Sequence, residues 1–155
     1  MRKIGTAIAA AAIPALTVLA APAHAASTQL LLTEMRSCDF HRVSYAQTPG
    51  KALPYAHITS DGHTATAQVD IRQGTPNAQY VVRLIPAPHA KLGCLAGDPS
   101  IGTASLTTDG AGTGSATAQV PIGSGVTGMW VAVDLPAPHS QTPNEFYTSS
   151  FTAPV

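Results

Sequence analysis

The chain has 155 residues, of which only 10% are charged, and its eight basic residues balance its eight acidic ones. This balance argues against a nucleic-acid binder, which needs a basic face to neutralise phosphates, and the sequence has no polybasic segment for an anionic membrane surface. The scarcity of charge, together with abundant Ala, Thr, Ser, Gly and Pro, is typical of extracellular β-domains rather than of helical proteins.

The first 25 residues have the three-part pattern of a secretory signal peptide. Two basic residues precede an apolar, Ala-rich run that ends in a small-x-small cleavage site over Ala23–Ala25. We therefore expect a signal peptide over 1–25, cleavage before Ala26, and a single exported domain over 26–155 without a membrane span. The alternative is an uncleaved membrane anchor. Loss of the leader removes two of the eight basic residues, so the mature net charge is near −2.

The segments after the leader have the pattern of short β-strands. Strands are predicted at about 29–35 and at 55–60, and two sets of blocks then follow each other in the same order. In both sets apolar residues alternate with polar ones, and an Asp-Gly pair marks a hairpin turn. The matched blocks are Ile58–Gly62, Ala65–Val69 and Pro86–His89 in the first copy, and Leu106–Gly110, Ala116–Val120 and Pro136–His139 in the second.

The repeat also predicts the remaining strands. They lie at about 80–84, 101–108, 131–135 and 145–152, and one extra residue near Ile85 predicts a β-bulge. Seven to nine short strands without helical periodicity predict an all-β domain. The spacing favours an immunoglobulin-like two-sheet sandwich with an internal repeat, and a small β-barrel is the alternative.

The two cysteines, Cys38 and Cys94, are expected to form one disulfide, because exported proteins oxidise such pairs. Catalytic signatures are missing from the sequence. It has no Gly-x-Ser-x-Gly elbow, and the G-x-G-x-x-G spelling over Gly123–Gly128 precedes a predicted strand instead of the helix that a dinucleotide site needs. We therefore expect a turn there, no cofactor and no enzymatic activity.

Four histidines are candidates for a copper or zinc site. His57 and His63 flank a predicted hairpin and could face each other across it. His89 and His139 occupy equivalent positions of the repeat, where two strand ends could approach each other. The alternative is that all four are solvated loop histidines.

Aromatic and basic residues gather in the segment 38–60, ahead of the repeat. Such residue types dominate contact energies, so Arg42, Tyr45, Tyr55 and His57 are candidate binding residues. The alternative is that part of this segment is one more ordinary strand. Trp130 is a further candidate, because the alternation that turns its neighbour Val131 inward leaves Trp130 facing solvent or a partner.

A family resemblance rests on the stretch from Asn77 to Pro121, about 45 residues. Its motifs, Tyr80-x-Val82, Gly93-Cys94, Thr108-Asp109, Gly112 and Ala116–Val120, are similar to those of actinomycete apo-chromoproteins of the neocarzinostatin type. The resemblance implies a secreted immunoglobulin-like sandwich that holds a small molecule in a cleft. That family carries two short-range disulfides, whereas the matching region here holds only Cys94.

These observations predict a secreted, non-catalytic binding or surface-interaction module. Its partner is expected to be an extracellular protein, a glycan or a small molecule. The alternatives are a protein that sequesters a small ligand or a copper or zinc ion, and a secreted hydrolase.

Overall fold

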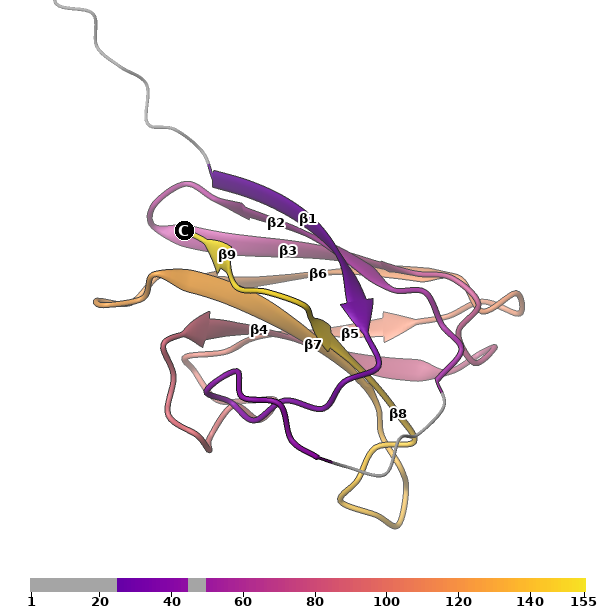
Figure 1. The fold of residues 1–155 in the computed structure, drawn as a ribbon. Helices are drawn as coiled ribbons and strands as arrows, with labels where there is room; N and C mark the ends of the chain where they lie inside the picture. The colour runs from indigo at the N-terminus through magenta and orange to yellow at the C-terminus, as the bar shows by residue number, and fades with distance from the viewer. Residues whose placement is uncertain (1–24, 45–49) are drawn as a thin grey trace, which may run out of the picture.

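The computed structural model describes residues 25–44 and 50–155, and these ranges contain strands and loops but no helix (Figure 1). The predicted signal peptide, apart from Ala25, therefore lies outside the described residues. Nine strands follow in chain order: β1 (Ala25–Leu32), β2 (Tyr55–Ser60), β3 (Thr64–Ile71), β4 (Gln79–Ala87), β5 (Gly102–Thr107), β6 (Gly114–Pro121), β7 (Gly128–Leu135), β8 (Glu145–Ser149) and β9 (Ala153–Pro154).

The strands form one antiparallel sheet that curls into a nearly closed barrel. Its order is β5-β4-β7-β8-β1-β2-β3-β6, and β9 pairs with β7. β1 joins the two halves, since its first part pairs with β2 while Leu31 and Leu32 pair with β8. The end strands β5 and β6 contact each other without forming a ladder. The all-β prediction is confirmed. A two-sheet sandwich is not confirmed, and the barrel alternative fits.

Glycine permits the close approach of the two end strands. A side chain at Gly102 in β5 would meet the backbone carbonyl oxygen of Gln119 in β6 at 2.7 Å. Real Cβ atoms do not come so close, so only glycine lets the two strands cross here.

The internal repeat is visible in the strand register. Ala67 lies opposite Ala118 in the β3–β6 pair, and Val82 lies opposite Val133 in the β4–β7 pair. The partners in both pairs are 51 positions apart, so each pairing is unchanged when the two copies are exchanged. The β4–β7 ladder runs without interruption past Ile85, so the predicted bulge is wrong. The drift of one residue in the repeat falls where the two copies differ in structure: β4 continues through Pro86, whereas β7 ends before the equivalent Pro136.

The inner face of the barrel is filled by alternate residues of its strands. Ala65, Ala67 and Val69 of β3 are fully buried, while Gln68 between them is exposed, as the predicted alternation requires. Burial of this apolar surface is the main source of folding free energy. The largest side chains of the inner core are Tyr80, Tyr147, Ile58, Ile71, Leu84, Leu106, Met129, Val69, Val82 and Val131.

A polar cluster joins two of these core residues to Glu145. The hydroxyl groups of Tyr80 and Tyr147 both donate to Glu145 Oε2, at 2.9 and 2.8 Å. Each phenol oxygen also accepts a hydrogen bond, from the backbone N–H of Thr75 at 2.9 Å and of Ala52 at 3.1 Å. Burial raises the pKa of Tyr147 far above its ordinary value, and the Glu145 carboxylate raises it further. Glu145 therefore satisfies two buried donors, and the two phenols tie the loops of Thr75 and Ala52 to the core.

Candidate functional site

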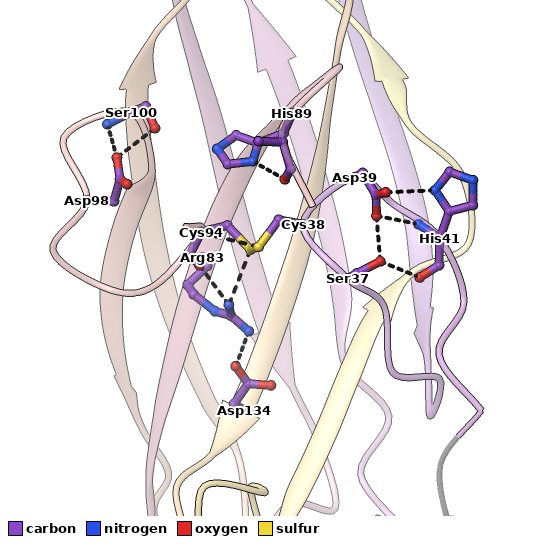
Figure 2. Close-up of a disulfide and its surroundings, with 11 residues drawn as sticks. Ser37, Cys38, Asp39, His41, Arg83, His89, Cys94, Asp98, Ser100 and Asp134 are labelled. Atoms are coloured by element: carbon purple, nitrogen blue, oxygen red, sulfur yellow. Dashed lines mark hydrogen bonds and ion pairs between the residues drawn. A yellow bond between two sulfur atoms is a disulfide. The ribbon is translucent and has the colours of Figure 1, made fainter. Parts of the chain in front are cut away.

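A second apolar cluster lies on the outer face of the β4–β7 pair. It contains Ile85, Trp130 and the two cysteines Cys38 and Cys94. Figure 2 shows the disulfide between these cysteines. Cys38 belongs to residues 33–44, here called the cap, which follow β1. Cys94 belongs to residues 89–100, here called the cysteine loop, which follow β4. The predicted disulfide is confirmed, and it fixes both segments to one face of the barrel.

Hydrogen bonds hold the cap in place along its length. The Thr148 hydroxyl in β8 donates to the Glu34 carbonyl at 2.7 Å, and Arg36 Nε donates to the Ser149 carbonyl at 3.1 Å. Nearer the disulfide, the Cys38 N–H donates to the Lys91 carbonyl of the cysteine loop at 3.2 Å. The cap is therefore part of the folded structure rather than a loosely attached loop.

Phe40 lies at the tip of the cap and closes it over Trp130. Its ring is 5.4 Å from the Trp130 ring in an edge-on arrangement, and the Arg36 guanidinium lies 4.1 Å from its centroid. The backbone of Phe40 has φ of 68°, which a bulky residue adopts only when its surroundings impose it. Arg36 helps to impose it by donating from Nη1 to the Phe40 carbonyl at 3.0 Å.

The expectation that Trp130 faces solvent is wrong. The alternation does place Trp130 on the face opposite Val131, but the side chain is only 1% exposed. The cap and the disulfide cover this face, and strand alternation cannot reveal that. Trp130 is therefore the centre of a second core and offers no surface to a partner.

Beside this second core, the outer face of the β4–β7–β8 sheet forms a groove of about 360 Å³. Five side chains of the three strands make its floor: Val81, Asp134 and Phe146 in one row across the strands, and Arg83 and Thr148 in the next. The walls come from the cap, the cysteine loop and the β7–β8 loop. The lining residues of these walls are Met35, Arg36, Leu95, Ala96, Pro136, Ala137, Ser140, Gln141 and Pro143.

An ion pair between Arg83 and Asp134 lies in the groove floor (Figure 2). Arg83 Nη2 donates to Asp134 Oδ2, while Nη1 donates to the Cys94 carbonyl at 2.8 Å. The two side chains are only 16% and 17% exposed. Burial raises the pKa of Asp134, and the neighbouring guanidinium opposes that rise. The ion pair thus links the groove to the disulfide-bonded loop.

Sequence reasoning missed this ion pair, although the repeat contains a signal for it. The alternation that turns Val131 inward and Trp130 outward also turns Asp134 outward. Arg83 and Asp134 are 51 positions apart, as are the paired equivalent residues of β4 and β7, so they hold equivalent places in the two copies. Opposite charges at equivalent, outward-facing positions of two adjacent strands indicate a cross-strand ion pair.

The predicted binding residues do not form one site. Arg42 is exposed on the cap and forms an ion pair with Glu34. Tyr55 and His57 lie on β2, in the part of the sheet away from the groove, where His57 Nδ1 is 2.7 Å from the Thr28 hydroxyl. Tyr45 lies outside the described residues.

The candidate metal-binding histidines are not brought together either. His57 lies opposite Gln68 in the β2–β3 ladder, and His63 is in the turn, so the two do not face each other. His89 and His139 follow β4 and β7, which run antiparallel, so these loops leave opposite ends of the strand pair. In the described ranges no group of three or more His, Cys, Asp or Glu side chains could hold a metal ion.

Other sequence predictions concern the glycine-rich segment and membrane insertion. The residues after Gly123 form a turn and then enter β7 at Gly128, as predicted. None of the described residues form a helix of the length and hydropathy needed to cross a membrane.

Comparison of the chain with protein-family models, curated proteins and solved structures gave no match.

Proposed function

We propose that this protein is an exported, non-catalytic binding protein that holds a small, largely apolar molecule in the groove on its β4–β7–β8 face. The observation that carries the proposal is the composition of the groove. Eight of its fourteen lining residues are apolar, and they surround one buried ion pair. Ligand sites commonly combine apolar walls with a few fixed polar groups, and a volume of about 360 Å³ lies in their usual range.

The disulfide-bonded cap supports a binding role. Two wall segments, the cap and the cysteine loop, are fixed to the sheet before any ligand arrives, which lowers the entropic cost of association. Leu95, on the wall, leaves 72% of its surface exposed, and a ligand would cover it.

Export and the absence of catalysis are parts of the same proposal. A disulfide between distant cysteines and the leader pattern both favour an oxidising, extracytoplasmic location. The described residues that line the groove include no histidine or cysteine, and the acid among them is engaged by Arg83. The resemblance to secreted apo-chromoproteins, which hold a small molecule in a cleft, agrees with this use of the groove.

Filling the groove tests the proposal. We expect the Ala137→Trp variant to lose binding of a neutral dansyl-alkyl probe, because Ala137 lines the groove and an indole would occupy it. Ala111→Trp is the matched control, since Ala111 is exposed in the β5–β6 turn. Fluorescence titration measures the affinity, and native mass spectrometry of protein recovered from culture medium detects a bound small molecule.

The fluorescence titration and the native mass spectrometry together test whether the groove binds a small molecule. Saturable binding by wild type and by Ala111→Trp, with loss in Ala137→Trp, is the expected result. Equal binding by Ala137→Trp would place the apolar site elsewhere. A wild-type protein that neither binds the probe nor carries a small molecule would contradict the proposal.

A further inference from the structure

Resting on the proposed function, we propose that Asp134 determines the chemical class of the ligand. The ligand is an apolar molecule that carries a basic amine, and its ammonium group binds the Asp134 carboxylate.

Asp134 occupies the middle of the groove floor. Its neighbours across the strands are Val81 on β4 and Phe146 on β8, both apolar. The hydrogen bond that the structure gives this carboxylate comes from Arg83 and uses Oδ2. An ionised carboxylate can accept about four hydrogen bonds, so Asp134 keeps acceptor capacity that its strand neighbours cannot use.

The two arginines of the groove are already bound by protein groups. Arg83 donates to the Cys94 carbonyl and to Asp134, and Arg36 donates to the Ser149 carbonyl, the Phe40 carbonyl and Glu34. Their guanidinium groups therefore offer little to an anionic ligand, which would also meet the like charge of Asp134. Arg83 is a positioning residue, because it holds the carboxylate in the floor.

The groove walls suit the rest of such a molecule. Val81 and Phe146 lie on either side of the carboxylate, and Pro143 and Leu95 lie in the walls around it. An ammonium group beside a carboxylate in this partly desolvated place forms a stronger hydrogen bond than a neutral donor does. The apolar body of the ligand would cover the walls, and its nitrogen would set its orientation.

Three dansyl probes with one alkyl chain test the inference. The chain ends in a primary amine, a hydroxyl or a carboxylate. We expect wild type at neutral pH to bind the amine about tenfold more tightly than the alcohol, and the carboxylate most weakly. Asp134→Asn should bind amine and alcohol equally, while its side-chain oxygen still accepts from Arg83. Asp70→Asn, on the outward face of β3, should keep the wild-type preference.

The outcomes separate the two proposals. Equal affinity of wild type for amine and alcohol, or a preference that survives in Asp134→Asn, would overturn the role of Asp134. If Ala137→Trp still abolished binding of every probe, the groove would remain the binding site and only the proposed ligand class would be wrong. If Ala137→Trp abolished binding of no probe, or if wild type bound no probe, the proposal that the groove is the binding site would be wrong. The wild-type comparison does not depend on the folding of any variant.

Discussion

Replacing both cysteines by serine is expected to lower the free energy of unfolding by about 4 kcal/mol. The disulfide closes a loop between positions 56 residues apart, and a cross-link of that span strongly restricts the unfolded chain. It also latches the cap over Trp130, so the same variant should show Trp130 emission at longer wavelength and quenching by iodide. Denaturant titration of Cys38→Ser/Cys94→Ser beside oxidised wild type measures the first effect.

Reduction of wild type with dithiothreitol provides the control. It should reproduce both changes without altering the sequence, and it should leave the double variant unaffected. A loss of less than about 1 kcal/mol, with Trp130 emission unchanged, would mean that the cap stays closed without the bond.

Glu145→Ala is expected to lower the free energy of unfolding by about 4 kcal/mol. The change removes the acceptor of two buried phenol hydroxyls, and each orphaned buried donor costs about 1–3 kcal/mol. Glu145→Gln should cost less, because its amide oxygen can still accept from Tyr80 and Tyr147. Asp70→Ala is the surface control, since its carboxylate accepts only a long bond from Gln68 at 3.4 Å. Chemical denaturation of the three variants gives the values.

A double-mutant cycle shows whether the loss arises from the phenols. In a Tyr80→Phe/Tyr147→Phe background no hydroxyl is left to be orphaned, so Glu145→Ala should cost much less there. An equal cost in both backgrounds would contradict the assignment and would attribute the loss to Glu145 contacts with other groups, such as the Thr75 hydroxyl at 2.6 Å.

The strands were predictable where one face of a strand is buried and the other is not. The prediction for 55–60 matches the bounds of β2, and the alternation over Ala65–Val69 correctly predicted the middle of β3. Strand ends were less predictable: β1 begins at Ala25 rather than at 29 and ends at Leu32. The last predicted strand, 145–152, ends early as β8 at Ser149, and the short strand β9 follows beyond it. The residue at which a strand begins or ends depends on its pairing with distant strands and not on the local sequence pattern.

The groove as a whole could not be predicted, because the register of the paired strands brings its floor residues together. Val81, Asp134 and Phe146 are far apart in the sequence and lie in one row only because β4, β7 and β8 pair as they do. The prediction that Trp130 faces solvent was wrong for a related reason. Period-two alternation assigns a side chain to a face, but whether a loop covers that face is decided by a disulfide to Cys38, distant in the chain.

Amide NMR of isotope-labelled protein titrated with the neutral dansyl-alkyl probe tests the central claim most directly, because it locates binding without any mutation. The groove on the β4–β7–β8 face predicts shifts of the backbone amides at 81–83, 95–96, 134–141 and 146–148, where its lining residues lie. The amides of β2, around Tyr55 and His57, should stay in place. Shifts concentrated on β2, with those of the groove unchanged, would contradict the account.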